Sequence, residues 1–98
     1  MARRPYRVIE DPAVEERLRN EDPELIDLWF TFVHQVLALA PADEHGSYDI
    51  AYVKAEAAYR LRVDAASGSF GFVYYQVLED ERLVLIVRYS WWRIDQLQ

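Results

Sequence analysis

The sequence predicts an α+β fold of the order β-α-α-β-β-β, in which a helical hairpin packs on one face of a small, mainly antiparallel sheet. Three apolar runs separated by two short polar breaks occupy residues 58–93, the pattern of a three-stranded meander. Two Asp-Pro pairs, at 11–12 and 22–23, mark helix starts with an acidic cap and proline at the first helical position. A β-prone run at 6–10 precedes them and supplies the first strand.

Length and composition exclude several classes of protein. The chain has 98 residues, of which 52% are hydrophobic and 14% aromatic, enough for one domain over residues 1–98. It contains no cysteine, which excludes thiolate metal sites and fits a reducing compartment. No apolar stretch approaches the roughly 18 residues of a membrane span, and no signal-peptide core follows the basic first residues. We expect a cytoplasmic protein with no membrane association, no cofactor and no metal.

The charge is acidic overall but unevenly distributed. The net charge is −6, with ten arginines and one lysine. This acidity argues against general binding to a nucleic-acid backbone, which depends on many cations that neutralise phosphates. Arginines nevertheless recur at 60 and 62 and at 88 and 93, so local basic patches remain.

The upstream half predicts two helices of unequal length. The first is short, with Val14 and Leu18 four residues apart on its apolar side. The second runs from 22 to about 40, where Pro41 stops it. Its wide apolar arc is typical of a helix that crosses a sheet and also touches another helix. His34 falls on the narrow polar side without a neighbouring Asp, Glu or His at ligand spacing, which favours an ordinary surface histidine.

Residues 41–57 give the weakest pattern. Residues 42–46 have the composition of a loop. Residues 47–57 fit either a short helix capped by Ser47 or an irregular segment that leads into the next strand. Three adjacent polar residues resemble metal ligands, but neighbours on a loop rarely converge on one ion, so a metal site is disfavoured. These residues are Asp43, Glu44 and His45.

The first run of the meander alternates, with Arg60 and Arg62 opposite its apolar residues, as in a strand with one face in water. The runs at 70–78 and 83–89 are apolar at nearly every position and predict central strands covered on both faces. The acidic break at 79–81 and the Gly68-containing break before 70 suit hairpin turns.

Three arginines and two tryptophans are candidates for partner or phosphate contact: Arg60, Arg62, Arg88, Trp91 and Trp92. Arg60 and Arg62 lie about 7 Å apart on one strand face and can hold a phosphate or an acidic segment, although a solvated strand face is the commoner role of such pairs. Trp91 and Trp92 point to opposite faces, so one can be buried and the other exposed. An exposed indole beside Arg88 or Arg93 fits a hot spot for a protein partner, or a base-stacking platform.

The amino-acid sequence of these strands resembles that of the RelE/ParE superfamily of bacterial toxins. The similarity lies in Tyr-Arg-Leu-Arg-Val at 59–63, in Val-Tyr-Tyr-Gln-Val-Leu at 73–78, and in Arg-Leu-Val-Leu-Ile-Val at 82–87. The resemblance implies a RelE/ParE-like domain that blocks translation, through mRNA in the ribosome, or DNA gyrase, and that a cognate antitoxin binds. If the protein is enzymatic, it would be a metal-independent mRNA endoribonuclease. Arg93 and Lys54 are the weak matches to the family's catalytic positions.

Other positions depart from the cleaving members of the family. Gly71-Phe72 stands where a basic residue is usual, and Trp91-Trp92-Arg93 stands where a small residue and two basic ones are usual. Because metal-free cleavage needs a base, an acid and cations at the phosphate, these departures put nuclease activity in doubt. The alternative is a non-catalytic protein-interaction module, such as a phage or host accessory protein, on the same scaffold. A small-ligand pocket between the sheet and the long helix is a third hypothesis.

Overall fold

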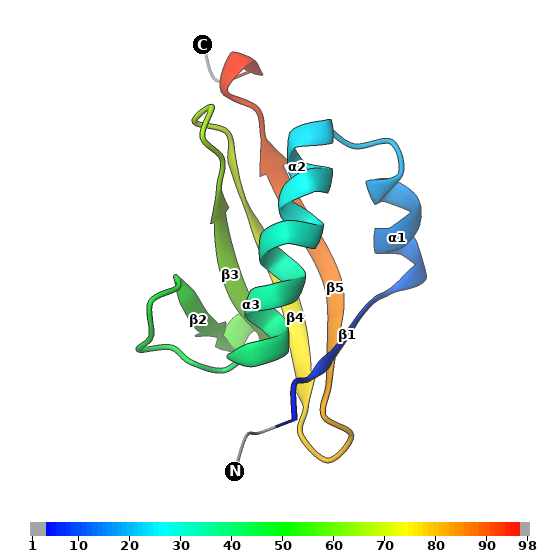
Figure 1. Cartoon of the computed structure of the whole chain (residues 1–98), viewed down its shortest axis with the longest axis vertical. Helices are drawn as coiled ribbons and strands as arrows, with labels where there is room; N and C mark the ends of the chain where they lie inside the picture. Colours follow the sequence, from blue (N-terminus) through cyan, green and yellow to red (C-terminus); the bar gives the residue numbers. More distant parts are fainter. Residues whose placement is uncertain (1–3, 97–98) are drawn as a thin grey trace.

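Five strands form one open sheet in the computed structural model, which describes residues 4–96 (Figure 1). Their order is β1-β5-β4-β3-β2, with β3, β4 and β5 as an antiparallel meander. The first strand lies at the sheet's edge and pairs in parallel with β5. The predicted α+β fold is confirmed. The strands are β1 (Arg7–Glu10), β2 (Ile50–Val53), β3 (Ala58–Asp64), β4 (Phe70–Leu78) and β5 (Leu83–Trp92).

The structure adds one strand that the sequence pattern did not reveal. β2 forms a hairpin with β3 through the 3-10 turn η2 (Lys54–Glu56), so the helix considered for residues 47–57 is absent. Ala57 closes the turn in the left-handed region, with φ of 52°. Ile50 is buried, and Tyr52 meets Tyr59 edge-on with ring centroids 5.0 Å apart. The tertiary pairing with β3 therefore outweighs the weak helical preference of this segment.

Both Asp-Pro pairs begin helices as predicted. Asp11 Oδ1 accepts a hydrogen bond from Ala13 N–H at 3.0 Å, and Asp22 Oδ1 accepts one from Glu24 N–H at 3.1 Å. These bonds satisfy backbone donors that the first helical turn leaves free. The helices are α1 (Pro12–Leu18), and a continuous long helix made of α2 (Pro23–Leu28), the π-helical turn η1 (Trp29–Val33) and α3 (His34–Leu39).

The π-helical turn keeps the long helix aligned with the sheet. Its core residues occur at every fourth position, at Leu25, Trp29, Val33 and Leu37, and are at most 1% exposed. In a regular α-helix of 3.6 residues per turn, this spacing would drift by about 40° per turn. The His34 N–H instead bonds to the Trp29 carbonyl, five residues back, and this wider turn takes up the excess.

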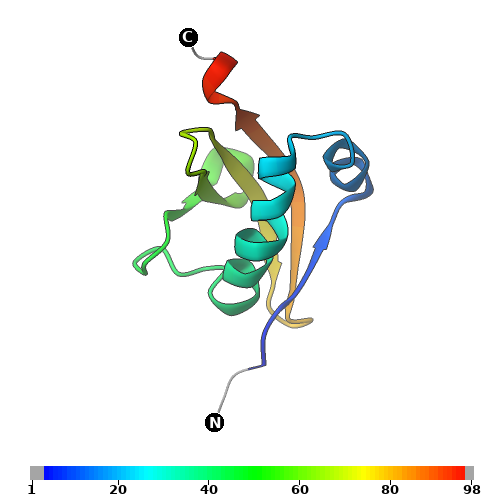
Figure 2. The same cartoon turned by 45° about the horizontal axis from the view of Figure 1, so that its top comes forward.

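The helices cover only one face of the sheet (Figures 1 and 2). On that face the strand residues are buried, among them Leu61, Val73, Tyr75, Val84 and Ile86. On the other face Phe70, Phe72 and Tyr74 of β4 are only half-buried. The prediction that 70–78 and 83–89 are covered on both faces is therefore wrong. Within residues 4–96, none of the helices has the length and hydrophobicity that crossing a bilayer requires.

A β-bulge in β5 reverses which of its residues face the helices. Tyr74 is opposite Arg88, but the next residue, Tyr75, is opposite Ile86, so β5 carries an extra residue at this point. Before the bulge the buried positions are Val84 and Ile86, and after it the buried position is Tyr89. The bulge therefore decides the faces of every residue in the last part of β5.

Tyr75 makes the stability of the fold depend on pH in the alkaline range. Its side chain is fully buried, and its hydroxyl donates a hydrogen bond to the Pro41 carbonyl at 2.5 Å. Burial, followed by the nearby Tyr59 and Glu44, raises the pKa of Tyr75 above its ordinary value. The pKa of Tyr89 is raised as well, first by burial and then by its hydrogen bond to Glu21.

We expect the free energy of unfolding to fall as pH rises above about 10, because the folded state holds these phenols neutral while unfolded tyrosines ionise. Tyr75→Phe should cost about 1 kcal/mol at neutral pH, since the Pro41 carbonyl loses its donor. The variant should also lose part of the fall in the free energy of unfolding at alkaline pH. Denaturant titrations followed by circular dichroism at several pH values measure both effects. An unchanged alkaline decline in Tyr75→Phe would contradict this role.

Candidate functional site

The face of the sheet that points away from the helices, which we call the open face, carries a cluster of arginine and aromatic side chains. Cross-strand pairing brings them together, because Arg62 is opposite Phe72, Arg60 is opposite Tyr74, and Phe70 is opposite Trp92. Residues that pair across neighbouring strands share a face. The open face consists of Arg60, Arg62, Phe70, Phe72, Tyr74, Arg88 and Trp92.

Three of the aromatic rings form one contact group. Phe70 stacks on Trp92 with centroids 5.3 Å apart and an interplanar angle of 25°. Phe72 meets both edge-on, at 6.4 Å from Phe70 and 6.1 Å from Trp92. Trp92 is 39% exposed, which is large for an indole. The group therefore presents apolar surface to solvent on a face that the helices leave uncovered.

The arginines lie over these rings. The guanidinium carbon of Arg60 is 4.8 Å from the Phe72 centroid, and that of Arg62 is 4.8 Å from the Phe70 centroid. Arg88 lies 3.7 Å above Tyr74. These distances are within the range of cation–π attraction, which is worth about 0.5–1 kcal/mol at exposed sites. The rings thus hold the three guanidinium groups, with their positive charges, close to the surface of the sheet.

Ion pairs neutralise part of this charge. Arg62 Nε is 3.0 Å from Asp64, and Arg88 Nη2 is 2.7 Å from Glu56. The hydrogen bond that Arg62 donates to Asp64 raises the pKa of Arg62 above its ordinary value. Among the described residues, no carboxylate is within ion-pair distance of Arg60. The open face therefore keeps an uncompensated positive charge on a chain whose net charge is −6.

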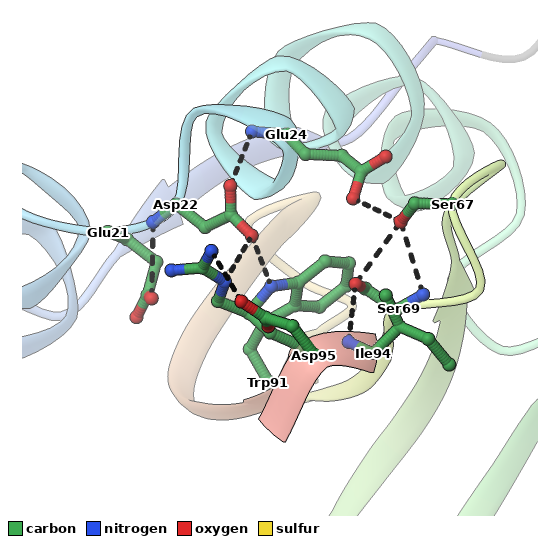
Figure 3. A network of polar contacts seen from close by, with 9 residues as sticks. Glu21, Asp22, Glu24, Ser67, Ser69, Trp91, Ile94 and Asp95 are labelled. Carbon is green, nitrogen blue, oxygen red and sulfur yellow. Dashed lines mark hydrogen bonds and ion pairs between the residues drawn. The ribbon is translucent and has the colours of Figure 1, made fainter. Parts of the chain in front are cut away.

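The two tryptophans lie on opposite faces, as strand alternation predicts. Trp92 belongs to the open face, whereas Trp91 is half-buried against the core on the helix side. Trp91 Nε1 donates a hydrogen bond to Asp22 Oδ2 at 3.2 Å (Figure 3). Trp91 is therefore a structural residue of the helix–sheet interface.

Arg93 belongs to the same polar network as Trp91, because both contact Asp22. Its guanidinium lies 3.7 Å from Asp22 and 3.1 Å from Asp95. Nearby, Ser69 Oγ accepts a hydrogen bond from the Ile94 N–H at 3.0 Å, and Ser67 Oγ donates one to Glu24 at 2.6 Å. The network thus joins the start of α2, the β3–β4 turn and the end of β5, and gives Arg93 a structural role.

The structure does not bring Arg93 and Lys54 together. Lys54 begins the turn before β3, while Arg93 follows Trp92, whose partner Phe70 pairs with the last residue of β3. A strand of seven residues spans about 23 Å at 3.3 Å per residue. The two weak catalytic candidates therefore lie at opposite ends of β3, too far apart to act on one phosphate.

Comparisons with protein-family models, with curated proteins and with solved structures found no match. Within residues 4–96, no group of three or more His, Asp or Glu side chains is arranged to hold a metal ion. The open face is thus the strongest candidate site that the geometry offers.

Two aromatic residues of the open face, Phe70 and Phe72, were missed from the sequence, whereas one of Tyr74 and Tyr75 was expected there. Phe70, Phe72 and Tyr74 occupy every second position of β4 and share one face. The intervening Gly71, Val73 and Tyr75 are buried on the other. The signal that identifies them is the combination of this period of two with the Arg60 and Arg62 alternation on the neighbouring strand.

We expect Asp22→Ala to lower the free energy of unfolding by about 2 kcal/mol, because one change removes a helix cap and the acceptor of the Trp91 indole. Arg93→Ala should cost under about 1 kcal/mol, since its ion pairs are half-exposed. Urea titrations of the two variants and the parent chain give both values. A larger loss in Arg93→Ala than in Asp22→Ala would contradict this order.

Proposed function

We propose that this protein is a toxin-like inhibitor that binds a protein partner through its open face and does not cleave RNA. The observation that carries the proposal is the cluster of three arginines lying over aromatic rings beside the exposed Trp92. Tryptophan, tyrosine and arginine are the residues that dominate binding energy at protein interfaces. The toxin-like part of the proposal rests on the resemblance of the strand sequences to those of RelE/ParE toxins.

The chemistry of the open face defines its partner. Arginines that project from two strands favour carboxylates, and the rings between them favour apolar side chains. A long phosphate backbone fits less well, because the protein as a whole is acidic, at −6, and repels it. The partner is therefore an acidic and apolar protein surface, on the translation machinery or on DNA gyrase. A cognate antitoxin would cover the same face.

The arrangement of charged groups supports blocking over cutting. Cleavage without a metal requires a base and an acid that are free to exchange protons near the phosphate. Two carboxylates beside the open face, Asp64 and Glu56, are each paired with an arginine. Arg93 is held by Asp22 and Asp95. These contacts favour a face that grips a partner and leaves its covalent bonds intact.

Induced expression of the protein in a bacterial host tests this proposal. We expect growth arrest with the parent chain and normal growth with the double variant Arg60→Ala/Trp92→Ala. Loss of such contacts costs about 2 kcal/mol or more, roughly a 30-fold loss of affinity. Purified protein should inhibit a translation extract or a gyrase supercoiling reaction, and sequencing of RNA ends should show no new cleavage sites.

Arg19→Ala is the matched control, because Arg19 is an exposed arginine that caps the C-terminal end of α1, away from the open face. It should leave the arrest unchanged. Normal growth with the parent chain would favour the alternative, a non-toxic interaction module on the same scaffold. Arrest that persists in the double variant would rule out the open face, and cleaved RNA would overturn the blocking mechanism.

A further inference from the structure

A second feature of the molecule is a cleft of about 560 Å³ between α1, β1 and the first half of the long helix. Its volume lies within the usual range of small-molecule sites, about 300–1,000 Å³. Its apolar wall consists of Ile9, Leu18, Ile26 and Phe30. This cleft lies on the helix side of the sheet and is independent of the open face.

The apolar wall includes side chains that the fold itself does not bury. Phe30 is 57% exposed and Ile9 is 37% exposed. The π-helical turn sets Phe30 beside His34, with ring centroids 5.5 Å apart. Such turns occur often at functional sites. The cleft is therefore an apolar surface that remains available in the free protein.

A partly buried carboxylate lies in the cleft. Glu10 is 17% exposed, and its Oε1 accepts hydrogen bonds from Trp29 Nε1 and His34 Nε2, both at 2.8 Å. His34 is thus half-buried and bonded, and the prediction of an ordinary surface histidine is wrong. Because both hydrogen bonds end on Oε1, the second oxygen, Oε2, keeps its capacity to accept from a further donor.

The charges of the cleft select the ligand. Glu15 and Arg19 pair with each other at 3.6 Å on the exposed surface of α1, so their charges offset one another. Glu10 is the other acidic residue that lines the cleft, and its carboxylate is not paired with a lysine or arginine among the described residues. The ammonium group of a ligand would complement this carboxylate.

We propose that this cleft binds a small organic amine whose ammonium group donates to Glu10 Oε2 and whose apolar body packs against Leu18, Ile26 and Phe30. Trp29 and His34 position the carboxylate by fixing its other oxygen. A neutral molecule of the same shape gains the apolar contacts alone, and an anion is repelled by Glu10. The ligand class is therefore defined by its charge as well as by its apolar body.

Three probes with the same phenyl group separate the contribution of charge from that of apolar packing. They are 2-phenylethylamine, 2-phenylethanol and 3-phenylpropionate. Titration of the full ¹⁵N-labelled chain, followed by amide chemical shifts, should give binding of the amine in about the millimolar range expected for so small a ligand. The alcohol should bind about tenfold more weakly, since it lacks the charge-assisted hydrogen bond. The acid should give no saturable shift. The shifted amides should cluster around residues 9–10 and 26–34.

Glu10→Gln is the decisive variant, because it removes the charge and keeps an oxygen that accepts from Trp29 and His34. It should bind the amine and the alcohol with equal affinity. Phe30→Ala, at a highly exposed position, should weaken both about equally. Trp92→Ala, on the open face, should change neither. Thermal unfolding of each variant shows whether it is folded.

Several results would overturn the proposal. Equal affinity of the parent chain for all three probes, or an amine preference that survives in Glu10→Gln, would exclude recognition through the carboxylate. Shifts centred on the open face would place the ligand elsewhere. A concentration-dependent dimer that covers the cleft would show that a second copy of the chain is its occupant.

Discussion

Burial of the Trp29 indole is the constraint on which the other features depend. The ring is fully buried, meets Tyr89 edge-on with centroids 5.3 Å apart, and donates its N–H to Glu10. An indole N–H buried without an acceptor would cost about 1–3 kcal/mol. The long helix, the edge strand and β5 therefore have to meet at this point. The wide helical turn that starts at Trp29 preserves this contact, and the carboxylate that satisfies the indole also lines the cleft.

Local signals were sufficient to predict most of the elements. The caps at Asp11 and Asp22 and the alternation around Arg60 depend only on neighbouring residues, and the structure follows them. Contacts between distant segments were not predictable in this way. β2 is a strand because it pairs with β3, and His34 is bonded because Glu10, 24 residues earlier, lies beside it. No pattern within a short window contains that information.

The candidate site was predictable only in part, because one bulge decides the faces of its last strand. If β5 continued without the extra residue, Arg88 and Trp92 would share the buried face of Val84 and Ile86. Alternation therefore placed the two tryptophans on opposite faces but could not identify the exposed one. Trp91 was therefore included among the contact candidates. Its structural role was not predictable from neighbouring residues, because its acceptor, Asp22, lies 69 residues away in the chain.

The guanidinium groups that lie over the rings of the open face also determine how the free protein behaves in solution. Hydrated charges lie over the phenyl and phenol rings, so we expect them to reduce nonspecific association between copies of the chain. If the proposed acidic partner binds here, its carboxylates would pair with the guanidinium groups and could expose the rings in the same event. A purely apolar surface would have to strip water from the guanidinium groups without compensation. On the proposed function, the same guanidinium groups would disfavour nonspecific hydrophobic contact and favour an acidic partner.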